Sequence, residues 1–117
     1  MKNDPERRKS KRRKFTFYMA VMDYDSGELI GHLTEISDFG FRLDCPKALP
    51  VNQDFKLSVE LTADFGGQAF MVLSARSKWC REDKLMPNAY NVGFQVMDLS
   101  PDDVAIYNLM LEKYGEG

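Results

Sequence analysis

The chain has very few of the residues that build metal centres and disulfide frameworks. Its 117 residues include two cysteines and one histidine. Cys45 and Cys80 lie far apart and neither belongs to a CxxC pair, so together with His32 they do not form a zinc-binding pattern. We expect both cysteines to be free thiols that behave as small apolar residues, and His32 to be structural or exposed. We expect no metal and no other cofactor.

Long apolar runs are also missing. No stretch approaches the roughly 20 residues that a membrane helix requires, and the basic N-terminus has no apolar segment of the kind found in secretory signals. We therefore expect a cytoplasmic protein that does not insert into membranes. The sequence contains neither a P-loop nor a recognisable pairing of nucleophile and base, so we also expect no enzymatic activity.

The charges are distributed unevenly along the chain. Residues 2–14 contain eight of the sixteen lysines and arginines and only two acids, which gives this segment a net charge of about +6. The rest holds eight bases and sixteen acids, about −8. A basic arm on an acidic body is typical of a protein that meets an anionic partner, most directly phosphate. We predict a flexible arm at 1–14, because it has almost nothing apolar to bury, and a single domain at 15–117.

The body alternates between apolar and polar residues in short segments, as β-strands do. Glycine-containing turns at 25–27, 37–40 and 66–67 separate several of these segments. We predict strands over 15–22, 28–36, 41 onward, 55–61, 69–80 and 90–97, with a polar loop over 81–88. Six short strands at regular spacing predict a mostly β fold, a small six-stranded antiparallel barrel with a split or Greek-key-like order.

The period changes near the C-terminus. Ser100 is a good N-cap, Pro101 suits the first helical position, and two aspartates follow. We predict an α-helix over about 101–114 that ends at Gly115. Four residues repeat there at helical spacing, Val104, Tyr107, Leu111 and Tyr114, and we expect the aromatic pair, Tyr107 and Tyr114, to contact the core.

Two local patterns carry the functional interpretation. The arm contains an RxxxR pattern over residues 8–12, preceded by Arg7, and the turn after the second predicted strand has the pattern ExSxxG over residues 35–40. Each pattern alone is weak, but their combination in this order resembles the PilZ domain, the bacterial receptor module for cyclic di-GMP. The resemblance covers nearly the whole chain. The segments 75–79 (ARSKW) and 91–94 (NVGF) are similar to two weaker landmarks of the same family.

The resemblance implies a binding site for cyclic di-GMP. Arginine binds phosphate bidentately, stacks on purines and donates to guanine O6 and N7, which is the role implied for the arm. The carboxylate of the ExSxxG turn would accept from the N1 and N2 hydrogens of guanine. The serine would bond a base or phosphate or cap the turn, the glycine would allow close backbone approach, and the tryptophan would stack on the ligand or serve as a packing anchor. The implied contact residues are Arg7, Arg8, Arg12, Glu35, Ser37, Gly40 and Trp79.

The turn departs from the family pattern at one position. The family motif begins with Asp or Asn, whereas this chain has Glu35, whose carboxylate lies about 1.5 Å further from the backbone because of one extra methylene. The resemblance implies a receptor or adaptor that orders its arm on cyclic di-GMP and signals to an unidentified partner protein. Two alternatives remain. One is a PilZ-like adaptor that binds no ligand, and the other is a small nucleic-acid-binding barrel, which the acidic body disfavours because it would repel a polyanion.

Overall fold

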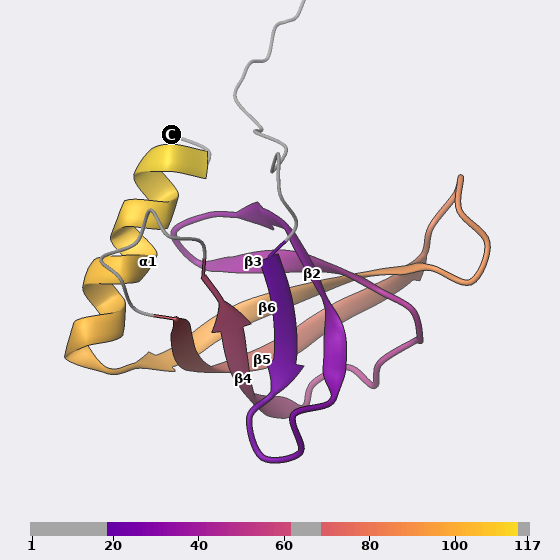
Figure 1. Ribbon diagram of the computed structural model, residues 1–117. Helices are drawn as coiled ribbons and strands as arrows, with labels where there is room; N and C mark the ends of the chain where they lie inside the picture. Colours follow the sequence, from indigo (N-terminus) through magenta and orange to yellow (C-terminus); the bar gives the residue numbers. More distant parts are fainter. Residues whose placement is uncertain (1–18, 62–68, 115–117) are drawn as a thin grey trace, which may run out of the picture.

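The computed structural model describes residues 19–61 and 69–114, which form six strands and one helix (Figure 1). The predicted arm at 1–14, the start of the first predicted strand, the 66–67 turn and Gly115 lie outside the described residues. The elements are β1 (Met19–Asp23), β2 (Leu29–Ile36), β3 (Gly40–Cys45), β4 (Asp54–Glu60), β5 (Phe70–Glu82), β6 (Tyr90–Leu99) and α1 (Pro101–Tyr114).

The strands close into an antiparallel barrel in the order β1-β2-β3-β6-β5-β4. The first three strands follow one another as hairpins, and β6 then pairs with β3 so that β5 and β4 complete the circle. Pairing of β1 with β4, for example Val21 with Val59, closes the barrel. The predicted six-stranded barrel is therefore confirmed.

The barrel interior holds the hydrophobic core. Buried positions alternate along β1, β4 and the first part of β5, as the period-two pattern predicts, and the alternation is interrupted in β2, β3 and β6. Phe94 links two aromatic contacts, stacked on Phe41 at 5.3 Å and edge-on to Phe55 at 5.6 Å between ring centroids. The largest fully enclosed side chains are Leu43, Leu57, Met71, Met110, Val21, Val92, Cys45 and Ser77.

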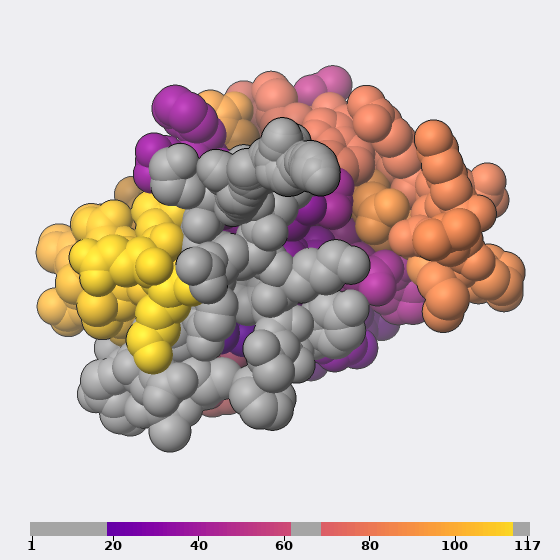
Figure 2. Space-filling model, turned by 90° about the horizontal axis from the view of Figure 1, so that it is seen from above, coloured from indigo at the N-terminus to yellow at the C-terminus, as the bar shows by residue number. Residues whose placement is uncertain are grey.

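Helix α1 lies against β2, β5 and β6 on one side of the barrel (Figures 1 and 2). Its start is as predicted, because the Asp103 amide donates to the Ser100 hydroxyl at 3.2 Å and that hydroxyl donates to the Asp103 carboxylate at 2.8 Å. Tyr107 is buried, as predicted, and it forms the buried apolar face with Ile106 and Met110. Val104 shares the helical spacing but is exposed. The helix of the described residues is too short and too polar to cross a membrane.

The β5–β6 hairpin extends away from the barrel on the side opposite α1 (Figures 1 and 2). The polar loop predicted from residue 81 was wrong at its start, because β5 continues to Glu82 and pairs with β6 through Arg81 and Glu82. Both side chains are exposed there, so they lack the alternation that identifies a strand. Asp83 then accepts bonds from the amides of Leu85 and Met86 at 2.8 and 3.0 Å, which fixes the turn.

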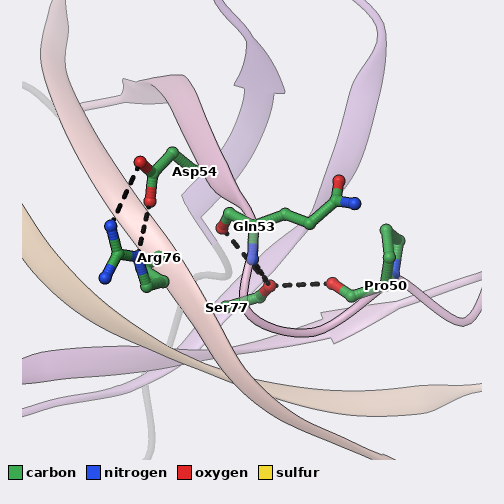
Figure 3. A network of polar contacts seen from close by, with 5 residues as sticks. All are labelled: Pro50, Gln53, Asp54, Arg76 and Ser77. Carbon is green, nitrogen blue, oxygen red and sulfur yellow. Dashed lines mark hydrogen bonds and ion pairs between the residues drawn. The ribbon is translucent and has the colours of Figure 1, made fainter.

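A buried serine joins the loop between β3 and β4 to the barrel (Figure 3). The Ser77 hydroxyl donates to the Pro50 carbonyl at 2.7 Å and accepts from the Gln53 amide at 3.2 Å. Backbone bonds from Asn52 to Ser77 and from Ser77 to Gln53 reinforce the junction. This serine therefore satisfies loop backbone groups that would otherwise be buried without a partner.

Both cysteines are free thiols, as predicted. Cys45 is enclosed in the core, and burial, with a smaller contribution from the neighbouring Asp44 charge, raises its pKa to about 12. Cys45 therefore behaves as an apolar core residue at neutral pH.

Candidate functional site

A groove of about 440 Å³ opens beside the turn that joins β2 to β3. Residues from four neighbouring strands, β2, β3, β6 and β5, line it, so it depends on the strand order of the barrel and not on one local segment. The lining residues are Glu35, Ile36, Ser37, Phe39, Gly40, Phe41, Arg42, Lys78, Trp79, Gly93, Phe94 and Gln95.

One row of cross-strand neighbours crosses the groove. Glu35 of β2 is paired with Arg42 of β3, Arg42 with Gly93 of β6, and Gly93 with Trp79 of β5. Neighbouring strands lie about 4.8 Å apart, so the row is about 14 Å long. It places a carboxylate and a guanidinium at one end and an indole ring at the other.

Two β-bulges place the ends of this row. The register shifts between Leu33 and Glu35 on β2, and again between Ser77 and Trp79 on β5. Strict alternation from the buried Leu33 and Ser77 would direct both Glu35 and Trp79 into the core. The extra residue in each strand instead leaves both side chains partly exposed in the groove.

Glu35 is held by an ion pair with Arg42. The Arg42 Nη2 atom lies 2.6 Å from Glu35 Oε2, and both side chains are only partly exposed. The Arg42 Nε atom is buried and has no hydrogen-bond partner within the described residues. The sequence interpretation missed Arg42, although a hairpin that turns at 37–40 places residue 42 opposite residue 35.

The turn itself is tightly bonded. The Ser37 amide and hydroxyl donate to the Gly40 carbonyl at 2.8 and 3.3 Å, and the Val96 amide donates to the Phe39 carbonyl at 3.0 Å. A Cβ atom on Gly40 would overlap the Phe94 carbonyl oxygen, so only glycine fits against β6. Ser37 therefore caps the turn, and the Phe39 side chain is left 82% exposed at the edge of the groove.

Tyr107 anchors the turn from the helix. Its hydroxyl lies 2.8 Å from the Ser37 carbonyl oxygen and 3.0 Å from that of Gly40, so its single proton is shared between them. Burial raises the pKa of Tyr107, with a smaller effect from the charge of Asp38. Tyr107 is thus more than the core contact expected from its helical spacing.

Trp79 both packs on the barrel and lines the groove. Its ring lies over Gly93, where a Cβ atom would overlap the indole. The Arg81 guanidinium lies 5.0 Å from the ring centroid, within range of a cation–π contact. The glycine of the NVGF segment therefore makes room for the tryptophan of the ARSKW segment.

A second ion pair lies beyond the groove in the next row. Arg76 Nε lies 2.7 Å from Asp54 Oδ1 and Nη2 lies 3.3 Å from Oδ2, a bidentate arrangement (Figure 3). The hydrogen bond from Arg76 lowers the pKa of Asp54 below its ordinary value, and the same bond raises the pKa of Arg76. Arg76 is thus engaged by Asp54 and does not line the groove.

The groove gathers all the predicted contact residues that the structure describes, Glu35, Ser37, Gly40 and Trp79. Arg7, Arg8 and Arg12 lie outside the described residues. Strand β1 begins at Met19, whose partner Leu33 stands two residues before Glu35. Six residues lie between Arg12 and Met19, and the seven steps from one to the other span at most about 25 Å in an extended chain. The arm is therefore long enough to reach the groove.

Comparisons with known proteins support the fold. No protein-family model matches the chain, and no curated protein matches it. The solved structure of the Bacillus subtilis inhibitor of motility, MotI/DgrA, is similar, with a TM-score of 0.65 over 91% of this chain. The two sequences are 10% identical, and this chain spans about half of that one, 51% of its length. At this identity the likeness concerns the fold alone.

Proposed function

We propose that the protein is a bacterial, cytoplasmic receptor for cyclic di-GMP that has no catalytic activity. The observation that carries the proposal is that the four implied contact residues that the structure describes line one groove. These residues come from β2, the turn, β3 and β5, and two bulges are needed to bring Glu35 and Trp79 there.

The groove suits a guanine base. The Glu35 carboxylate accepts hydrogen bonds, and guanine presents the N1 and N2 hydrogens on one edge. Trp79 offers a ring on which a base stacks, a contact worth about 1–3 kcal/mol per base. Phe39 adds a second exposed aromatic side chain at the groove edge.

The arm supplies the charge that the groove needs for phosphate. Arg8 and Arg12 would clamp the phosphates and the Hoogsteen edges of the guanines, with Arg7 as a further contact. Closure of the arm over the ligand would then present a new surface to a partner protein. The similar fold of a Bacillus subtilis inhibitor of motility fits an output of this regulatory kind.

Isothermal titration of cyclic di-GMP tests the proposal. We expect micromolar or tighter binding to the wild type, no binding of GTP in the same range, and loss of binding in Arg8→Ala/Arg12→Ala. The stoichiometry will show whether one ligand or an intercalated pair is bound. Absence of heat at tens of micromolar ligand in moderate salt would contradict the receptor function.

One observation favours a second candidate, an adaptor that binds a partner protein without a ligand. Glu35 replaces the Asp or Asn of the family motif, and its carboxylate is already bonded to Arg42. If this ion pair closes the site, the wild type would bind no cyclic di-GMP and still form a stable partner complex. Tight binding of DNA or RNA with a steep salt dependence would instead indicate the nucleic-acid alternative.

A further inference from the structure

We infer that Arg42 is a positioning residue that makes the long Glu35 side chain competent to recognise guanine. The inference rests on the proposed function of the same groove, and it concerns how a glutamate replaces the shorter Asp or Asn of the motif. Arg42 itself is not part of that motif. It is identified here by its place in the structure, directly across the strand pair from Glu35.

The geometry fixes the carboxylate. Glutamate has one more rotatable bond than aspartate, so a free Glu35 would lose more side-chain entropy when it orders on a ligand. The bond of 2.6 Å from Arg42 Nη2 to Oε2 restricts that freedom before any ligand arrives. A side chain that is already ordered loses less conformational entropy when the ligand binds, so more of the interaction free energy contributes to affinity.

Arg42 is well suited to hold another side chain. Its Nε atom is buried, and its side chain is only 32% exposed although it carries a charge. A guanidinium enclosed by packing in this way loses little further freedom in forming the pair. Both partners stand on adjacent strands of the closed barrel, so the backbone beneath them is rigid as well.

The ion pair by itself does not use up the hydrogen-bonding capacity of the Glu35 carboxylate. A carboxylate has about four lone-pair positions on its two oxygens, and the bond to Arg42 uses one of them at Oε2. Recognition of the N1 and N2 hydrogens of guanine is therefore compatible with the pair. The pair helps electrostatically too, because the positive charge of Arg42 offsets a carboxylate that would repel the ligand phosphates.

A double-mutant cycle at positions 35 and 42 tests the inference. Aspartate at position 35 would withdraw the carboxylate by about 1.5 Å, out of reach of Arg42 and into the position of the family motif. We expect Arg42→Leu to weaken cyclic di-GMP binding about tenfold or more in the wild-type background. In the Glu35→Asp background we expect Arg42→Leu to change the affinity less than about twofold.

The outcomes are separable. If Arg42→Leu weakens cyclic di-GMP binding equally in both backgrounds, Arg42 contacts the ligand or supports the fold. If it does not weaken binding in the wild-type background, Glu35 needs no positioning. Either result overturns the inference while the receptor function stands. A wild type that binds no cyclic di-GMP would overturn both. Thermal unfolding of each variant reports on folding, and if Arg42→Leu is unfolded, Arg42→Gln removes the ion pair while it keeps a polar side chain at this position.

Base specificity gives an independent readout. Cyclic di-IMP lacks the 2-amino group and so loses one of the two hydrogens offered to Glu35. Arg42→Leu should therefore weaken binding of cyclic di-GMP more than binding of cyclic di-IMP. If the role of Arg42 were purely structural, Arg42→Leu would weaken the binding of both ligands by the same factor.

Discussion

The hydroxyl of Tyr107 on α1 hydrogen-bonds at 2.8 Å to the carbonyl oxygen of Ser37, a residue in the turn beside the groove. The same hydroxyl lies 3.0 Å from the Gly40 carbonyl oxygen at the other end of the turn. Seventy positions separate Tyr107 from Ser37 in sequence. The C-terminal helix thus holds the turn that presents the proposed ligand contacts.

Removing this hydroxyl should destabilise the protein and loosen the turn. We expect Tyr107→Phe to lower the free energy of unfolding by about 1–2 kcal/mol, because the part-buried Ser37 carbonyl loses this partner and the Gly40 carbonyl keeps only its bonds from Ser37. Urea denaturation measures the change. Tyr90→Phe is the matched control, since the Tyr90 hydroxyl makes no hydrogen bond within the described residues, and a similar loss in that variant would show that the Tyr107 bonds contribute little.

Substitution of Gly40 should be among the most damaging single changes in the turn. A Cβ atom there would overlap the Phe94 carbonyl oxygen, so β3 and β6 must move apart. We expect Gly40→Ala to cost about 3 kcal/mol or more of stability. Gly27→Ala is the comparison, because Gly27 has a φ of 75° and open space around it, so its cost should stay near 1 kcal/mol. Equal thermal midpoints for the two variants would refute the steric argument.

The buried hydroxyl of Ser77 should stabilise the loop between β3 and β4. Ser77→Ala removes the bonds to Pro50 and Gln53 and leaves their backbone groups without this partner (Figure 3). We expect a loss of about 1–3 kcal/mol and faster amide exchange at Gln53. Ser74→Ala, on the same strand, is the control because its hydroxyl makes no hydrogen bond within the described residues. Unchanged exchange at Gln53 would count against the role of Ser77.

The Asp54–Arg76 pair should make stability depend on pH. The hydrogen bond from Arg76 holds the pKa of Asp54 below its ordinary value of 3.8 in the folded state. The pair therefore stabilises the fold above that value and loses its effect as the pH falls through the lower, folded-state pKa. Asp54→Asn should lower the urea midpoint slightly at pH 7 and leave it unchanged near pH 2. The difference at pH 7 should shrink in high salt, because the pair is exposed.

Glu60→Gln on the same strand is the control for this pair. Glu60 is exposed and has no ion-pair partner within the described residues. Its substitution should therefore leave the change in urea midpoint between pH 7 and pH 2 the same as in the wild type. An Asp54→Asn effect that persists at low pH would contradict the electrostatic explanation.

Local patterns predicted much of this fold. The helix over 101–114, the hairpin around 37–40 and most strand positions follow from alternation, turn residues and an N-cap, which act over a few residues. The buried face of α1 was predicted only at Tyr107, because Val104 fits the helical spacing as well as Ile106 does. Only the packing of α1 against the barrel decides which of the two is enclosed.

The site was predicted where it is continuous in sequence and missed where it depends on the barrel. Ser37 and Gly40 lie in one turn and were found together. The cross-strand partner Arg42 was missed because it depends on register, and Tyr107 was expected as a core contact but not as an anchor of the turn, which depends on helix docking. The bulge before Trp79 carries no clear sequence signal, so alternation alone would have placed this residue in the core.

The most direct test of the central claim uses the fluorescence of Trp79, the single tryptophan of the chain, which lines the groove. Titration with cyclic di-GMP should produce a saturable change in Trp79 emission in the micromolar range. GTP should produce no such change, and Glu35→Ala should weaken or abolish the response. Heat of binding without any change in Trp79 emission would place the ligand elsewhere on the molecule, and neither heat nor emission change would contradict the receptor account altogether.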